Sequence, residues 1–220
     1  MEGLQIITTR QSCRAFKGDP IPGDIMQKIL AAAGNSPSYT NTQPWEVAVV
    51  TGQKKDKLAA ELLKLAKAKA PARPDIPHPS GWPSRMEERK GEHGARRLNA
   101  LGVDRGDKEG REKLRLMNYE FYGAPCAVFL FMEGTLGEWS VYDMGLFTQN
   151  LILAAHSLGV ESCIQASVTD YAGEIKEFLG ISENKKLLAC ISMGYPDGDA
   201  ALNTYRSQKI SLDDFVRWYK

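Results

Sequence analysis

The sequence predicts one α+β domain, residues 1–220, in which helices flank a mixed, mostly antiparallel sheet. Helical patterns and short apolar strand patterns follow each other without a strict strand–helix–strand rhythm. The length of 220 residues is enough for one domain with a substantial core. The content of 43% hydrophobic and 25% charged residues is typical of a globular protein.

The N-terminal third predicts a helix, a loop, a strand and a second helix. Residues 21–38 include an amphipathic helix that ends at Gly34, because glycine favours helix C-termini. Residues 35–44, "NSPSYTNTQP", are small, polar and proline-containing, which indicates a loop. A β-rich run at 45–52 is followed by an amphipathic helix at 53–70.

Residues 71–118 predict an excursion from this core. The stretch "PARPDIPHPSGWPS" is too rich in proline for regular structure. The charged residues that follow it predict helix in pieces. Long insertions in compact domains are often lids or binding loops, and a flexible linker is the alternative.

The C-terminal half predicts three strands and two helices. Apolar runs predict strands at 124–133, 161–167 and 185–196. A short helix is expected at 169–181 with Thr169 or Asp170 as its cap, and a terminal helical turn or two at 212–220.

A long helix at 138–160 is apolar nearly all round from Leu146 to Leu158, so it lies either in the core or at a subunit interface. The candidate interface residues are Tyr142, Phe147 and Leu151.

Charge and cysteine content exclude several classes of protein. The net charge of +1 does not favour nucleic acid or an anionic membrane, and no apolar run is long enough to cross a bilayer. The start lacks the apolar core of a signal peptide. Four dispersed cysteines without a CxxC pair, and three histidines outside any ligand motif, indicate reduced thiols and no metal. These features predict a cytoplasmic protein.

No nucleotide-binding, hydrolase or metalloprotease motif is present: GxGxxG, GxxxxGK[ST], GxSxG and HExxH are all missing. An enzyme with this sequence is therefore expected to take its chemistry from a bound organic cofactor.

The stretch "TTRQSCRAF" places Arg10, Ser12 and Arg14 at alternate positions. In an extended segment these side chains point the same way, and two guanidiniums with a hydroxyl suit a phosphate. A solvated turn with ordinary surface arginines is the alternative.

Four blocks of sequence, in order, resemble the FMN-dependent nitroreductase family. They are "TTRQSCRAF", "SPSYTNTQPWEVAVV", "DMGLFTQNLILAAHSLGVESCIQAS" and "ISMGYPDGDAALNTYRSQKISLDDFVRW". They cover nearly the whole chain apart from residues 71–118. The resemblance implies a nitroreductase-like fold, FMN as cofactor, NADH or NADPH as donor, and a homodimer with the central helix at its interface.

The resemblance implies that Arg10, Gln11, Ser12 and Arg14 hold the FMN phosphate and ribityl chain. Arg206 and Lys209 then approach the phosphate from the C-terminal side. The chain departs from the family here, because it has Lys209 and Ser211 where arginine and proline are usual. Lysine is a point charge without a fork, so which of Arg206 and Lys209 holds the phosphate stays open.

The resemblance also implies that each flavin site takes a loop from the other subunit, so that a monomer is inactive. The loop residues expected at the flavin are Pro37, Ser38, Tyr39, Asn41 and Gln43. Ordinary turn chemistry is the alternative for Asn41 and Gln43, and core packing is preferred for Trp45.

The strand "CIQAS" is expected to pass the reactive edge of the flavin, with a backbone N–H of Ile164 or Gln165 bonding N5. Many relatives have glycine near Ala166, where the methyl group narrows the approach. The expected role of Cys163, Cys126 and Cys190 is core packing. No catalytic side chain is expected, because the proton can come from water.

The excursion offers candidates for substrate contact. Aromatic and thioether side chains that suit an aromatic substrate are Trp82, Met86, Tyr119 and Tyr122, with packing between lid and core as the alternative for each. The arginines that suit an anionic substrate are Arg85, Arg89, Arg96 and Arg97, and a solvated helix face is their alternative.

The function predicted is an FMN-dependent oxidoreductase that uses NAD(P)H in a ping-pong reaction to reduce nitroaromatic or quinone-like acceptors. One alternative is a related flavoenzyme with a substrate-specific lid, such as a reductive dehalogenase. The other is a flavin-binding protein without turnover. The acceptor, and the choice between NADH and NADPH, stay open.

Overall fold

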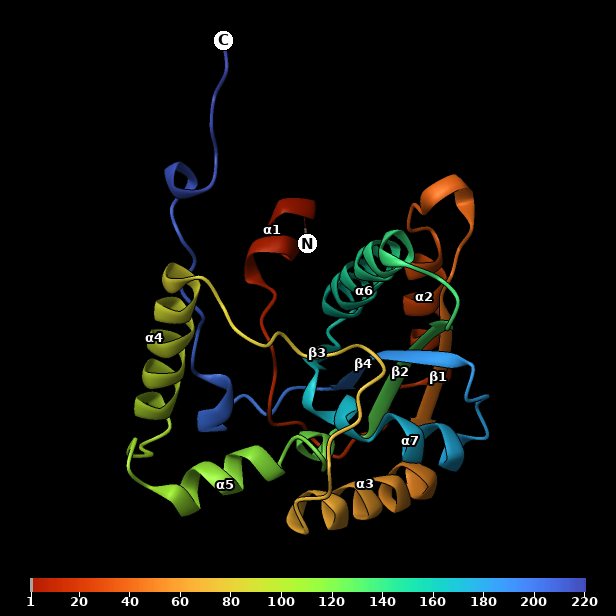
Figure 1. Ribbon diagram of the computed structural model, residues 1–220, viewed down its shortest axis with the longest axis horizontal. Coiled ribbons are helices and arrows are strands. Elements are labelled where there is room, and N and C mark those ends of the chain that lie inside the picture. The colour runs from red at the N-terminus through yellow and green to blue at the C-terminus, as the bar shows by residue number, and fades with distance from the viewer. Residues whose placement is uncertain (1) are drawn as a thin grey trace.

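The computed structural model describes residues 2–220 and contains an antiparallel sheet of four strands in the order β1-β2-β4-β3. The strands are β1 (Glu46–Thr51), β2 (Cys126–Glu133), β3 (Glu161–Gln165) and β4 (Lys185–Gly194). Helices cover both faces of the sheet (Figure 1). The predicted α+β class and the mostly antiparallel sheet are therefore confirmed.

Helices α2 (Gly23–Gly34) and α6 (Glu138–Ser157) cover one face of the sheet. The even-numbered residues of β2, from Cys126 to Met132, point to this side, because side chains alternate along a strand. Phe147 and Leu151 of α6 are buried here, whereas Tyr142 is exposed. Of the candidate interface residues in α6, only Tyr142 is free to meet another chain.

Helices α3 (Gly52–Lys67) and α7 (Ala172–Leu179) cover the opposite face. Phe129 and Phe131 of β2 point to this side and are fully buried. Burying a side chain of this size stabilises the fold by about 1.5–3 kcal/mol. Trp45 stacks on Phe147 with ring centroids 4.9 Å apart, which agrees with the preferred core role of Trp45.

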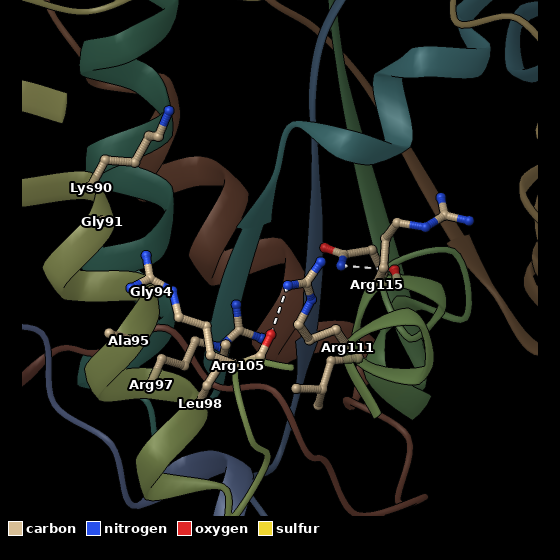
Figure 2. Close-up of a pocket in the computed structure, with 11 residues that line it drawn as sticks. Lys90, Gly91, Gly94, Ala95, Arg97, Leu98, Arg105, Arg111 and Arg115 are labelled. Carbon is tan, nitrogen blue, oxygen red and sulfur yellow. Dashed lines mark hydrogen bonds between the residues drawn. The ribbon is translucent and has the colours of Figure 1, made fainter. Parts of the chain in front are cut away.

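The excursion begins with residues 71–83, which contain no helix or strand. They are nevertheless fastened to the core, because Asp75 pairs with buried Lys176 at 2.9 Å and accepts the backbone N–H of Leu187 at 2.8 Å. Helices α4 (Ser84–Ala100) and α5 (Lys108–Leu116) follow, as the predicted pieces of helix. They project to one side of the sheet (Figure 1), with a cleft of about 390 Å³ between them (Figure 2).

The chain ends differ in part from expectation. Residues Gly3–Thr9 form a helix, α1, that the sequence did not predict. The cap of α7 is Tyr171, and not Thr169 or Asp170, because Ser167–Tyr171 forms a 3₁₀ turn of its own.

Short 3₁₀ segments complete the chain. They are η1 (Tyr39–Asn41), η2 (Phe121–Gly123), η3 (Ser167–Tyr171), η4 (Ala201–Asn203) and η5 (Leu212–Asp214). Beyond η5 the C-terminal residues leave the body of the molecule (Figure 1). Across residues 2–220 no helix has both the length and the apolar character needed to cross a bilayer.

Candidate functional site

The N-terminal block from Arg10 to Phe16 runs in extended form beside the free edge of β3. Ser12 forms a parallel bridge with Ser162, and Phe16 forms an antiparallel bridge with Pro196. The backbone N–H of Cys13 donates to the carbonyl of Ser162 at 2.9 Å. The expected extended conformation of this block is therefore present.

A C-terminal segment lies against the same block. The side chain of Asn203 accepts the backbone N–H of Arg14 at 2.7 Å and donates to the carbonyls of Ala15 and Asp197 at 2.8 Å each. Gln11 Nε2 donates to the carbonyl of Asn203 at 3.3 Å. Segments nearly 190 residues apart in sequence are thus joined through one amide side chain.

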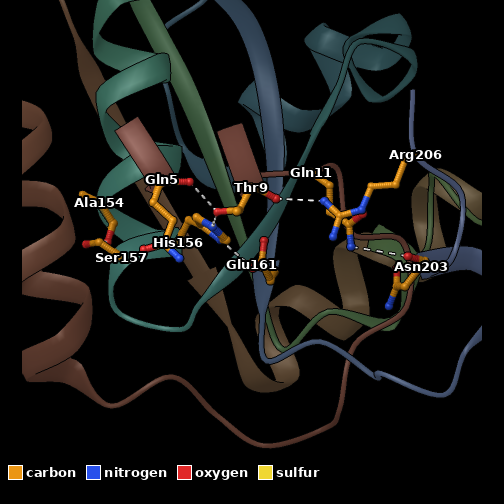
Figure 3. Close-up of polar contacts among 9 residues, drawn as sticks. All are labelled: Gln5, Thr9, Gln11, Ala154, His156, Ser157, Glu161, Asn203 and Arg206. Atoms are coloured by element: carbon orange, nitrogen blue, oxygen red, sulfur yellow. Dashed lines mark hydrogen bonds and ion pairs between the residues drawn. The ribbon is translucent and has the colours of Figure 1, made fainter. Parts of the chain in front are cut away.

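Arg206 and Lys209 take different places. Arg206 Nη1 donates to the carbonyl of Thr9 at 2.9 Å, which brings its guanidinium to the N-terminal block (Figure 3). Lys209 lies against α4 beside His93 and Tyr205. Arg206 is therefore the C-terminal cation in direct contact with the N-terminal block.

The donors in this region are available to a ligand. Among residues 2–220, Arg10, Arg14 and Arg206 form no ion pair with a carboxylate. The buried Oε1 of Gln11 has no hydrogen-bond partner within the described chain. Free guanidiniums suit a phosphate, and an orphan acceptor suits a hydroxyl donor. This donor set fits the phosphate and the polyhydroxyl chain of FMN.

A second polar cluster supports the start of the block. His156 Nδ1 lies 2.6 Å from Glu161 Oε1, and His156 Nε2 lies 2.8 Å from Thr9 Oγ1 (Figure 3). The order resembles a hydrolytic triad, but the Thr9 hydroxyl donates to the carbonyl of Gln5 at 2.6 Å. Its proton is engaged, so the cluster ties α1 to α6 and β3 without an activated nucleophile.

The free edge of β3 presents alternate backbone groups. The carbonyl of Ser162 points to this edge, where it accepts the backbone N–H of Cys13. Alternate residues of an antiparallel strand direct their backbone groups to the same side, so the N–H and C=O of Ile164 point to this edge as well. Gln165 is paired with Cys190 and directs its N–H to β4. The expectation that Gln165 offers an N–H to the flavin is therefore wrong, whereas the backbone of Ile164 faces the open edge.

The side chain of Gln165 is also committed to the interior. It is 2% exposed, and its Nε2 donates to the carbonyl of Asn118 at 2.7 Å. Its Oε1 accepts a hydrogen bond from Ser192. Gln165 therefore acts as a buried connector between β3, β4 and the residue that follows α5.

The loop at 35–44 is exposed and strained. Thr40, Asn41 and Gln43 have φ between 48° and 59°, which is rare for residues other than glycine and unusual for β-branched threonine. The N–H of Tyr39 donates to Asp143 of α6 at 3.1 Å, and the Tyr39 ring stacks on Trp139. Backbone strain held by the surrounding structure is typical of functional loops.

This loop and the N-terminal block lie near opposite ends of α6. The loop contacts Asp143, and Thr9 contacts His156, thirteen residues further along the helix. At 1.5 Å per residue this separation is about 20 Å. Within one chain, the loop and the start of the N-terminal block therefore lie at separate places along α6.

The structure divides the candidate substrate residues. Trp82 and Met86 are exposed where the excursion enters α4. Tyr119 is 2% exposed and packs against Tyr171, and Tyr122 is 6% exposed with its hydroxyl donating to Asn118 at 2.8 Å. Stacking of substrate on Tyr119 or Tyr122 is therefore wrong for this structure, because both rings fill the core beneath the excursion.

The cysteines are all buried and unpaired. Burial raises the pKa of Cys13 to about 11 and that of Cys126 to about 12, and it raises the pKa of Cys163 and Cys190 as well. Thiols with raised pKa values are poor nucleophiles at neutral pH. This agrees with packing as their role.

The sequence did not identify two residues that organise the site, Asn203 and His156. Asn203 lies in a short polar stretch that predicts only a turn, and His156 lies alone in an apolar helix. Their partners are distant in sequence, so no local pattern marks either residue.

Comparison with known proteins identifies the family of this chain. The Nitroreductase family profile matches residues 7–195. The nitroreductase NfnB of Mycolicibacterium smegmatis is 36% identical over 97% of this chain and 91% of its own length. The 4-nitrobenzoate reductase of Pseudomonas putida is 31% identical over 97% and 93%.

A solved structure agrees over the whole fold. The crystal structure of the FMN-dependent nitroreductase NfnB from Mycobacterium smegmatis in complex with NADPH superimposes with a TM-score of 0.95. It shares 34% identity and covers 99% of this chain and 97% of the other. The chain belongs to the nitroreductase family, and the expected nitroreductase-like fold is confirmed.

Proposed function

We propose that this protein is an FMN-dependent nitroreductase that takes electrons from NADPH and passes them to nitroaromatic acceptors. The observation that carries the proposal is the patch made by residues 10–14 and 203–206. It combines three guanidiniums without carboxylate partners and the buried, unpartnered Oε1 of Gln11. Similarity to an FMN-dependent nitroreductase and to a 4-nitrobenzoate reductase supports the cofactor and the acceptor class.

In this proposal each segment has a separate role. Arg10, Arg14 and Arg206, with the Ser12 hydroxyl, hold the phosphate by charge-assisted hydrogen bonds. Gln11 accepts from a ribityl hydroxyl. The backbone of Ile164 lines the reactive edge of the ring, and bound FMN supplies hydride acceptance and release there.

The site is completed by a second copy of the chain. The loop contacts Asp143 about 20 Å along α6 from the contact of Thr9 with His156, so we assign its residues to the site of the partner subunit, namely Pro37, Ser38, Tyr39, Asn41 and Gln43. Large apolar side chains are exposed on α1, on the first turns of α6 and in the C-terminal tail, which is typical of protein interfaces. They are Leu4, Ile7, Trp139, Tyr142, Phe215, Trp218 and Tyr219.

Two further parts of the proposal concern the excursion and the compartment. Residues 71–118 belong to the same single domain and form a wall of the site that acts as a lid, with Trp82 and Met86 at its entrance.

Four free, buried cysteines suit the reducing cytoplasm.

Turnover tests the function. Purified protein with FMN should consume NADPH steadily when 4-nitrobenzoate or nitrobenzene is added, and the nitro group should be reduced. Flavin-containing protein that is reduced by NADPH but is not reoxidised by any nitroaromatic would contradict the acceptor class. It would favour a related flavoenzyme with a more specific lid.

A further inference from the structure

The cleft between α4 and α5 carries an excess of positive charge. It is lined by Lys90, Arg97, Arg105, Arg111 and Arg115, and by no carboxylate. The whole chain has 28 basic and 27 acidic residues, so this local excess is not a property of the overall composition. Concentrated charge of one sign in a cleft raises the local concentration of a ligand of opposite charge.

Two of the five cations are already paired. Lys90 pairs with Glu87 at 2.6 Å, and Arg115 pairs with Glu112 at 2.7 Å and donates to the carbonyl of Ala66. The other three, Arg97, Arg105 and Arg111, form no ion pair within residues 2–220. The cleft therefore holds three uncompensated guanidiniums.

These three arginines come from different elements and converge. Arg97 belongs to α4, Arg105 to the loop after it, and Arg111 to α5 (Figure 2). Arg111 Nη1 donates to the carbonyl of Arg105 at 2.9 Å, which fixes the loop to α5. One guanidinium is enough for a carboxylate, whereas three suit the two negative charges and three oxygens of a phosphate monoester.

The α4 wall of the cleft is made of small residues. Gly91, Gly94 and Ala95 line the cleft one helical turn apart, followed by Leu98. A side chain added at Gly91 or Gly94 would meet only open space, so neither glycine is required by packing. Glycine is less favourable than alanine inside a helix, and packing requires neither glycine, so we attribute both to the space that a ligand needs in the cleft.

The inner end of the cleft connects to the proposed flavin edge. Asn118 lines the cleft, and its carbonyl accepts the side chain of Gln165, which follows Ile164 on β3. A ligand with one end at Ile164 thus has its other end within reach of the cleft.

We propose that this cleft binds the ribose 2′-phosphate of NADPH, with Arg105 and Arg111 as its principal ligands. The inference rests on the proposed function for the nicotinamide end of the ligand. The cleft then selects NADPH over NADH, which lacks this phosphate, and the excursion that carries α4 and α5 acts as a specificity element.

Direct binding tests the proposal without turnover. Calorimetric titration of the flavin-containing protein should show binding of adenosine 2′-monophosphate, and a much weaker response to adenosine 5′-monophosphate. Arg105→Ala and Arg111→Ala should each weaken the binding of adenosine 2′-monophosphate about ten-fold or more. Arg85→Ala, an exposed arginine of α4 outside the cleft, is the matched control and should leave it unchanged.

Kinetics with a neutral acceptor, nitrobenzene, give the second readout. In Arg105→Ala and Arg111→Ala the KM for NADPH should rise by a similar factor, while the KM for NADH and the kcat stay the same. Three results would overturn the proposal. They are the absence of 2′-phosphate binding, an equal rise in KM for both nucleotides, and, in a parallel assay with the anionic acceptor 4-nitrobenzoate, a rise confined to the KM for that acceptor, which would assign the cleft to the acceptor.

These results separate the two proposals. If NADPH reduces the flavin but the protein does not bind adenosine 2′-monophosphate, the proposed reductase function stands and the proposed 2′-phosphate site is rejected. If adenosine 2′-monophosphate binds through Arg105 and Arg111 but NADPH does not reduce the flavin, the proposed 2′-phosphate site stands and the proposed reductase function is rejected.

Discussion

Asn203 Oδ1 accepts the backbone N–H of Arg14 at 2.7 Å and so joins the C-terminal segment to the N-terminal block. The same amide donates to the carbonyl of Ala15 at 2.8 Å. Because Arg14 and Arg206 lie on either side of this connection, the geometry of the proposed phosphate site depends on it. The two residues that this hydrogen bond joins are 189 positions apart in the sequence.

Asn203→Ala should weaken FMN binding about ten-fold, because the backbone N–H of Arg14 and the carbonyl of Ala15 lose their partner. Fluorescence titration of FMN with the apoprotein measures the Kd. Asn184→Ala, which removes an exposed amide, is the control and should bind FMN as the parent does. An unchanged Kd in Asn203→Ala would show that the two segments hold their places without this amide.

Arg10→Ala and Arg14→Ala should each weaken FMN binding far more than Lys90→Ala. Charge-assisted hydrogen bonds to a phosphate contribute about 1.5–3 kcal/mol each, which corresponds to roughly ten-fold or more in Kd. Lys90 pairs with Glu87 and lies in the separate cleft, so its removal leaves the flavin phosphate untouched. Equal FMN affinity in all three variants would refute the assignment of the phosphate site.

Mixing two inactive variants tests the shared site. Asn41→Ala alters the loop, and Arg10→Ala together with Arg14→Ala alters the phosphate block. If each site takes its loop from one chain and its block from the other, a mixed dimer contains one site with both alterations and one intact site. Unfolding and refolding the variants together should restore about a quarter of parental activity. No recovery, with mixed dimers shown by mass spectrometry, would place both segments in one chain.

Asp75→Asn should destabilise the protein by about 3 kcal/mol, because it leaves the buried Lys176 ammonium without its counter-charge. Urea unfolding followed by circular dichroism measures the change in the free energy of unfolding. Asp24→Asn breaks an exposed pair with Lys28 and should have little effect. If the two variants lose the same stability, residues 71–83 are not fastened by this pair.

Local patterns predicted most helices and strands, since β2 is a continuous apolar run whose successive residues are buried on the two opposite faces of the sheet. They left the block at Arg10–Phe16 open between an extended segment and a solvated turn. They missed α1, and they left Tyr119 and Tyr122 open between substrate contact and packing against the core, because the pattern of a segment does not show which side of an excursion packs on the core.

The choice between Ile164 and Gln165 also depended on information outside the local sequence. It needed the identity of the neighbouring strand on each side of β3: Cys190 of β4 on one side and the N-terminal block on the other. Likewise, the contacts of Asn203 and His156 join elements that only the tertiary structure brings together. The sequence also does not show that Arg97, Arg105 and Arg111 line one cleft, because they come from α4, the loop after it and α5.

The most direct test of the proposed function is an absorption spectrum of the purified protein, followed by anaerobic titration with NADPH. The proposal predicts a yellow protein whose flavin absorption bleaches on titration and returns when 4-nitrobenzoate is added. A colourless protein that does not take up FMN would contradict the flavin site. A yellow protein that resists reduction by NADPH would contradict the proposed electron donor.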